Sequence, residues 1–133
     1  MKPAYIDSSL LLALRLPKPN VVKPAAGDFA DFQFFSSNLL EAEVRACYRR
    51  ERVPFQTAVL AGVEWVLPRR ALHDEFAQVM SVGYLRGADL LHVATALYLR
   101  ANARDVWFAT LDVRQGEIAS ALGFERLKTI DTI

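Results

Sequence analysis

The chain opens with a short apolar run that gives way to a leucine-rich run at an aspartate: AYIDSSLLLALRL, residues 4–16. The apolar residues 4–6 suit a buried strand, and residues 8–16 have the composition of a helix. A strand that passes directly into a helix begins a β–α unit, in which the next strand runs parallel to the first. This stretch therefore predicts a parallel α/β fold with Asp7 at the end of its first strand.

The rest of the chain continues this alternation. Further strands are predicted at 32–35, 106–109 and 124–129, and further helices at 39–52, 88–100 and 112–122. Three prolines and a glycine predict a loop over 17–28. Residues 54–104 show no alternating segment, and we expect two or three helices there, with breaks near Pro68 and at Gly83 or Gly87. The order of elements predicts a three-layer α/β/α sandwich around a mainly parallel sheet of about four to five strands.

Length and composition suit one compact domain. The chain has 133 residues, of which 53% are hydrophobic, so we expect a single domain over 1–133 with a core of its own. Its one cysteine, Cys47, excludes an internal disulfide and fits a reducing compartment. The N-terminal residues do not resemble a signal peptide, and no apolar stretch is as long as a membrane span, so we expect a soluble cytoplasmic protein. The net charge of +1 means that any binding of nucleic acid needs a local basic patch.

Acidic residues follow the predicted strands or begin the helices that come after them. Asp7 and Asp112 lie just beyond strands. Glu41 lies in the first turns of the helix after the second strand, and Asp89 begins the apolar helix over 88–100. Ligands of parallel sheets bind beyond the carboxyl ends of the strands. Four carboxylates that meet there repel one another unless a cation neutralises them, and Mg²⁺ or Mn²⁺ prefer such oxygen ligands. The pattern indicates a metal site that could activate water against a phosphodiester.

Each acid also has a structural interpretation. Asp7 can cap the first helix, and Asp89 can complement a helix dipole. The pairs Asn38–Glu41 and Asp112–Gln115 have the spacing of capping boxes, and Glu41 with Arg45 has the spacing of an i,i+4 ion pair. Taken singly, these interpretations are favoured. The whole set favours a site, because all four positions fall where ligands bind in this architecture.

Four segments of the chain resemble the PIN domain, and within that family the VapC-type toxins of toxin–antitoxin pairs. They follow the family's order: Tyr5-Ile6-Asp7-Ser8-Ser9, Ser36-Ser37-Asn38-Leu39-Leu40-Glu41, Arg86-Gly87-Ala88-Asp89-Leu90-Leu91-His92-Val93-Ala94-Thr95-Ala96-Leu97, and Ala109-Thr110-Leu111-Asp112 with Ala121-Leu122-Gly123-Phe124.

The resemblance implies an endoribonuclease that needs Mg²⁺ or Mn²⁺ and hydrolyses RNA phosphodiester bonds. It matches the family's four acids to Asp7, Glu41, Asp89 and Asp112, and its serine or threonine two residues before the last acid to Thr110. It also implies a homodimer and a cognate antitoxin protein. The chain departs from the family over 17–28, where many relatives have a helical arm and this sequence has prolines.

Basic residues near the acids have two interpretations. Arg45, Arg49 and Arg52 share one helical stripe, for which a solvated face is the default and a phosphate-binding edge the alternative. Arg86, just before Asp89, is a further candidate for binding RNA. His92, one turn after Asp89, is interpreted as a packing residue rather than one that orients a metal-bound water.

Two other functions compete with the nuclease. A receiver-type signalling domain is also a small parallel α/β unit with acids at strand ends, and Thr110 and Lys128 could serve as its threonine and lysine. Its middle strand is missing from 54–104, and Ser8-Ser9 stands where a receiver has a paired acid. The other competitor is a catalytically silent PIN-like module that only binds a partner. Loss of an acid would favour that function, and none is lost.

Overall fold

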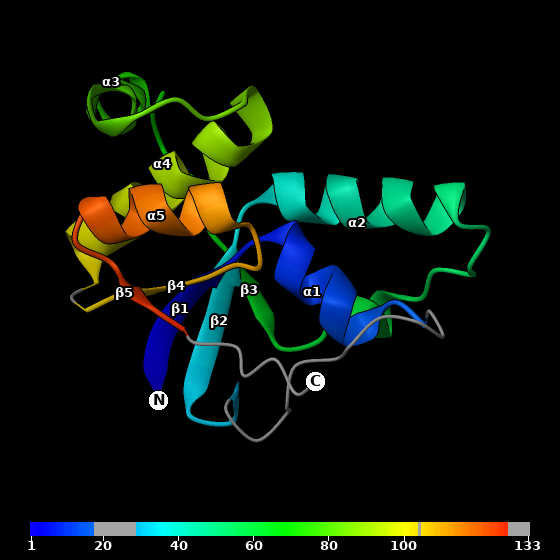
Figure 1. Cartoon of the computed structure of the whole chain (residues 1–133). Helices are drawn as coiled ribbons and strands as arrows, with labels where there is room; N and C mark the ends of the chain where they lie inside the picture. Colours follow the sequence, from blue (N-terminus) through cyan, green and yellow to red (C-terminus); the bar gives the residue numbers. More distant parts are fainter. Residues whose placement is uncertain (18–28, 104, 128–133) are drawn as a thin grey trace.

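The strands and helices of the chain alternate, as a computed structural model of residues 1–17, 29–103 and 105–127 shows (Figure 1). The strands are β1 (Lys2–Ile6), β2 (Phe32–Ser36), β3 (Val63–Trp65), β4 (Trp107–Ala109) and β5 (Glu125–Arg126). The helices are α1 (Ser8–Arg15), α2 (Asn38–Arg50), α3 (His73–Val82), α4 (Gly87–Asn102) and α5 (Val113–Ala121), with a short 3₁₀ helix, η2 (Thr57–Leu60). The predicted α/β class is confirmed.

The five strands form one sheet in the order β3-β2-β1-β4-β5. Every pair of neighbouring strands is parallel, with Ala4 opposite both Phe34 and Trp107. The chain first extends the sheet from β1 towards β3 and then crosses to the other side of β1 to add β4 and β5. The order therefore reverses between β1 and β4, which is the position where open parallel sheets form their ligand sites.

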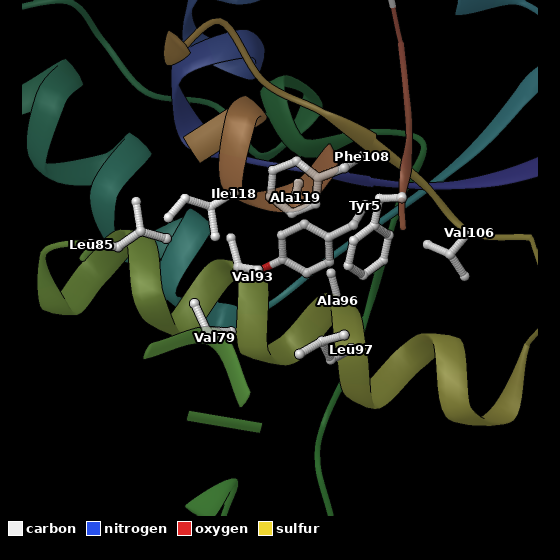
Figure 2. Packing of buried hydrophobic residues seen from close by; sticks show 11 residues of the cluster. Tyr5, Val79, Leu85, Val93, Ala96, Leu97, Val106, Phe108, Ile118 and Ala119 are labelled. Carbon is white, nitrogen blue, oxygen red and sulfur yellow. The ribbon is translucent and has the colours of Figure 1, made fainter. Parts of the chain in front are cut away.

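Apolar side chains cover both faces of the sheet. On one face Tyr5 and Phe108 pack with Val93 of α4 and Ile118 of α5 (Figure 2). On the other face Ile6 and Ala109 pack with buried leucines of α1 and α2. Neighbouring residues of one strand thus enter opposite cores, as the alternation of side chains along a strand requires. These two cores form the predicted three layers and fix the ends of β1 and β4 beside each other.

One prediction about the middle of the chain was wrong. Residues 54–104 contain α3 and α4, as expected, but also the strand β3. Its three residues, Val63-Glu64-Trp65, are too few for an alternating pattern to stand out. They become a strand because they pair with β2, with a further hydrogen bond from the Val66 amide to the Ser36 carbonyl (2.8 Å).

The presence of β3 does not make the fold that of a receiver domain. Receivers have the strand order 2-1-3-4-5, with the third strand beside the first. Here β3 is an edge strand beside β2 and is followed by the apolar residues Val66 and Leu67. The order of the strands therefore distinguishes this fold from that of a receiver.

The ends of the remaining elements agree closely with expectation. The chain after α5 turns at Gly123 with a φ of 94°, a conformation in which glycine has no Cβ penalty. The final strand is shorter than the predicted 124–129, and the end of that range lies outside the described residues, as does the predicted loop from residue 18 onward. None of the described helices has the length and hydrophobicity needed to cross a membrane.

Candidate active site

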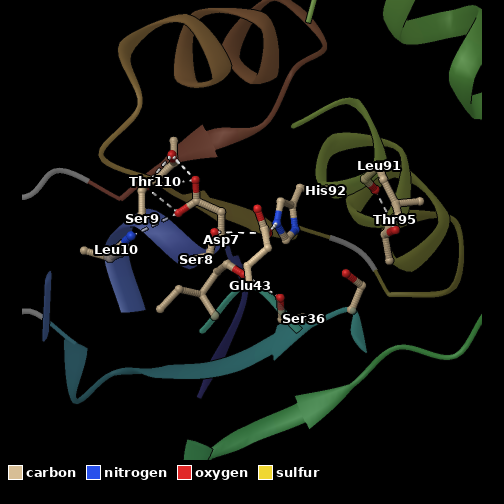
Figure 3. A network of polar contacts seen from close by, with 12 residues as sticks. Asp7, Ser8, Ser9, Leu10, Ser36, Glu43, Leu91, His92, Thr95 and Thr110 are labelled. Carbon is tan, nitrogen blue, oxygen red and sulfur yellow. Dashed lines mark hydrogen bonds and ion pairs between the residues drawn. The ribbon is translucent and has the colours of Figure 1, made fainter. Parts of the chain in front are cut away.

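Asp7 lies at the carboxyl end of β1 and is buried, with 3% of its surface exposed (Figure 3). Its carboxylate accepts hydrogen bonds from Thr110 Oγ1 (2.5 Å), Ser9 Oγ (2.8 and 3.0 Å) and the Leu10 amide (3.1 Å). The last of these caps α1, so the structural interpretation of Asp7 is confirmed. Burial raises the pKa of the Asp7 carboxyl, while these hydrogen bonds and the charge of His92 oppose the rise.

Thr110 joins the ends of β1 and β4. Its hydroxyl donates to Asp7 and accepts a hydrogen bond from the Asp112 amide (2.9 Å). Asp112 then caps α5 by accepting from the Gln115 amide (2.8 Å). Only half of the predicted capping box forms, because the Gln115 side chain does not return a hydrogen bond. Two strand ends and two helix starts are thus held together by short side chains.

A chain of hydrogen bonds crosses the site from Tyr5 to Glu43. The Tyr5 hydroxyl lies 2.7 Å from His92 Nδ1, and His92 Nε2 lies 2.7 Å from Glu43 Oε1, which also accepts from Ser8 Oγ (3.1 Å). An ionised carboxylate only accepts, so Nε2 carries a proton. Burial raises the pKa of Tyr5 to about 12, so the phenol stays protonated. His92 is 1% exposed and is a polar bridge as well as the packing residue that we predicted.

Glu43, and not Glu41, is the acid of α2 at this site. Burial raises the pKa of Glu43, but the hydrogen bonds from His92 and Ser8 and the charge of His92 outweigh it, so the net pKa is lowered. Glu41 instead forms an ion pair with Arg45 (2.7 Å), the local i,i+4 pair that its spacing allowed. Residues two apart on a helix project about 200° from each other, so both glutamates cannot face the same site. The helix also starts differently from the predicted Asn38–Glu41 capping box, because Ser37 is its N-cap residue.

Asp89 and Asp112 line one recess of about 210 Å³, together with Tyr84, Arg86 and Arg114. Burial and the charges of Asp112 and Glu43 raise the pKa of Asp89, while the Gln115 amide and His92 lower it. Gln115 is fully buried, yet neither its side-chain nitrogen nor its oxygen makes a hydrogen bond of ordinary length. A buried amide without partners is costly, so this part of the site has unused hydrogen-bonding capacity.

These residues fit a hydrated divalent ion rather than a closed protein cage. Among residues 1–17, 29–103 and 105–127, no three His, Cys, Asp or Glu side chains are close enough to hold one ion. Mg²⁺ typically takes one or two carboxylates and keeps several waters. Asp89 and Asp112 supply such oxygens in one recess, and their mutual repulsion favours a cation there.

The predicted RNA-binding arginines differ in their surroundings. Arg45 is paired with Glu41 and lies over the Phe55 ring at 4.3 Å. Arg49 lies with Arg52 at a shallow surface hollow at the end of α2. Arg86 lines the recess that holds Asp89 and Asp112, and Arg114, which the sequence reasoning missed, lines it too. Of the predicted arginines, Arg86 is the one that lines the same recess as Asp89 and Asp112.

Comparison of the chain with models of protein families and with curated proteins gives no match.

Proposed function

We propose that this chain is a metal-dependent endoribonuclease of the PIN type, which acts in the cytoplasm as the toxin of a toxin–antitoxin pair. The observation that carries the proposal is a set of acids beside the ends of β1 and β4, where the strand order reverses. Thr110 joins the Asp7 carboxylate to the Asp112 backbone, and the charges of Asp112 and Glu43 act on Asp89. The resemblance of four sequence segments to VapC-type PIN domains supports the same function. Structural capping explains Asp7 and Asp112 singly, but it does not explain the half-buried Asp89 that lines one recess with Asp112.

The residues of the chain have distinct roles in this proposal. Asp89 and Asp112 would bind Mg²⁺ or Mn²⁺ directly or through water, with Asp7 and Glu43 adding negative charge. Such an ion supplies an activated water and stabilises charge on the scissile phosphate and leaving oxygen. Thr110 holds the Asp7 carboxylate, and His92 holds that of Glu43, so neither has to be ordered when substrate arrives.

The test is cleavage of RNA by the purified protein with Mg²⁺ or Mn²⁺, alone and with EDTA. Asp89→Asn keeps the shape of the side chain and removes its charge, so we expect cleavage to fall by roughly a hundredfold or more. Glu64→Gln, on the exposed edge of β3, is the matched control and should cleave like the wild type. Cleavage that survives EDTA, or an Asp89→Asn variant with full activity, would contradict the proposal.

The homodimer and the antitoxin are proposed from the resemblance. Large apolar side chains are exposed and supply surface that a partner would cover: Leu67 and Val113 are each more than half exposed. Light scattering of the purified protein, alone and with the product of the neighbouring gene, measures both assemblies. A monomer that ignores the neighbouring product would contradict this part of the proposal.

A further inference from the structure

An exposed aromatic ring lies at the rim of the acidic recess. Tyr84 is 71% exposed and follows α3, on the connection that leads to α4. The next residue, Leu85, is 4% exposed and belongs to the core beside the sheet. The residue before it, Gly83, lies so close to α5 that an added Cβ would stand 2.6 Å from Ile118 Cδ1. The backbone on both sides of Tyr84 is thus packed against the protein while its ring faces solvent.

Two guanidinium groups lie at the same rim. Arg86 is exposed, and its guanidinium makes no hydrogen bond or ion pair within the described parts of the chain. Arg114 has one loose ion pair, to Glu117 at 3.7 Å, and its side chain is 58% exposed. Both line the recess with Asp89 and Asp112, the residues proposed to bind the metal ion. The rim therefore combines an aromatic face and two available cations immediately next to the proposed reaction centre.

We infer that this rim binds one unpaired nucleotide of single-stranded RNA, next to the phosphate that is cleaved. The inference rests on the proposed function. The base stacks on Tyr84, and Arg86 and Arg114 contact the phosphates on either side. Base–aromatic stacking with nearby cations is how proteins commonly hold single strands.

The geometry favours an unpaired nucleotide over a duplex. A base within a helix has both faces covered by its neighbours, so it cannot stack on a ring. The recess of about 210 Å³ is smaller than the roughly 300–1,000 Å³ that encloses a drug-sized ligand, which suits one nucleotide of a longer chain. A protein partner at this rim is the competing occupant, and the experiment separates the two.

The experiment measures the binding of a fluorescein-labelled single-stranded RNA of about ten nucleotides in EDTA, by anisotropy, where no cleavage is expected. Tyr84→Ala should weaken binding by roughly 5- to 100-fold, the range found for the loss of one stacked base, whereas Tyr84→Phe should bind within about twofold of the wild type. Arg86→Gln and Arg114→Gln should each lower the slope of log affinity against log salt by about 0.7.

Two control variants test whether the effects depend on the location of the residues at the recess rather than on their type. Leu67→Ala removes another exposed apolar side chain, and Arg69→Gln removes another exposed arginine, both outside the recess. Neither should change affinity or salt slope beyond what the loss of overall charge produces. A duplex of the same sequence should bind more weakly than the single strand and should not respond to Tyr84→Ala.

The outcomes separate this inference from the proposed function. If the wild type cleaves RNA and Tyr84→Ala binds RNA as tightly as the wild type does, the inference is overturned and the proposed nuclease function stands. Tyr84-dependent binding in a protein that never cleaves RNA would support the rim and contradict the nuclease. Loss of antitoxin binding in Tyr84→Ala, with RNA binding unchanged, would make the rim a protein-docking surface and overturn the inference.

Discussion

The acids on the two sides of the candidate active site differ in how far the protein itself satisfies them. On the side of β1 and α2, Asp7 accepts from three groups and Glu43 from two. On the side of α4 and α5, Asp89 is half-buried and the neighbouring Gln115 amide makes no hydrogen bond of ordinary length. The folded protein therefore supplies hydrogen bonds to the acids of the first side, the closed side, and fewer to those of the second, the open side.

This difference suggests that the two sides of the site have different roles. A carboxylate that is already bonded is fixed in place but has few oxygens to offer, whereas an underbonded one is available to an ion or a substrate. We expect mutations on the closed side at Tyr5, Glu43 and His92 to reduce both stability and activity, whereas loss of the buried Asp7 charge should reduce activity without a loss of stability. Mutations on the open side at Asp89 and Gln115 should reduce activity while stability stays level or rises. Asp112 lines the same recess but also caps α5, so its replacement should reduce stability as well.

The largest effect should separate the two glutamates of α2. Glu43→Gln removes a charge that acts on Asp89, so RNA cleavage should fall by about a hundredfold. Glu41→Gln loses an exposed pair with Arg45, and its activity should stay within about threefold of the wild type because such pairs contribute little. Rates measured with saturating RNA and Mg²⁺ test this. Equal losses of cleavage in both variants would contradict the assignment of Glu43, rather than Glu41, to the site.

The next effect tests the closed side by stability. Tyr5→Phe leaves the ring packed but deprives His92 Nδ1 of its partner, so the free energy of unfolding should fall by about 2 kcal/mol. Tyr98→Phe is the matched control, because the Tyr98 hydroxyl accepts a hydrogen bond from the Arg69 amide near the surface, and its cost should be about 0.5 kcal/mol. Urea denaturation in EDTA measures both. A larger loss in Tyr98→Phe would show that the buried chain of hydrogen bonds adds nothing special.

A smaller effect of opposite sign is expected on the open side. Gln115→Leu replaces a buried amide that makes no hydrogen bond of ordinary length with an apolar group of similar size, so the metal-free protein should gain about 1 kcal/mol. Gln78→Leu, on the exposed face of α3, should change stability by less than about 0.5 kcal/mol. The same urea series provides the measurement. Destabilisation by Gln115→Leu would indicate that water already satisfies the amide.

The smallest effect is a dependence on pH at Asp7, since its hydrogen bonds offset part of the cost of burial. Its folded pKa is raised above the unfolded value of about 4. The stability that protonated Asp7 contributes is therefore present below about pH 4 and is lost as pH rises through the folded pKa. In EDTA, Asp7→Asn should match the wild type in acid and become the more stable protein as pH rises.

Urea denaturation at a series of pH values checks this prediction. Asp31→Asn, at an exposed position, should show no such trend. If the wild type became the more stable protein at neutral pH, the hydrogen bonds to Asp7 would outweigh its burial.

The sequence predicted the features that depend on local composition. The ends of β1 and β4, and hence the positions of Asp7, Thr110 and Asp112, follow from apolar runs that stop at polar residues. β3 was missed because three residues carry too little pattern and the partner strand decides their conformation. Tyr5 and His92 are 87 residues apart, so no local pattern could pair them.

The choice between Glu41 and Glu43 depended on the rotation of α2, which one sequence motif does not give. A usable signal was the residue one turn later. Glu41 has Arg45 one turn later and forms an ion pair within the helix. Glu43 has Cys47 one turn later, which offers no positive charge, so its hydrogen-bond donors come from other elements.

The hydrogen bond between Asp7 and Thr110 joins residues 103 positions apart, which has a consequence for synthesis. β1 is the central strand of the sheet, and its neighbour β4 is translated after β2 and β3. Until then Asp7 has neither its Thr110 partner nor the companion acid Asp112. Non-local pairing of this kind also makes folding slow. A nascent chain that ends before Thr110 would therefore carry an incomplete candidate site, and under the proposed function it would not cleave RNA.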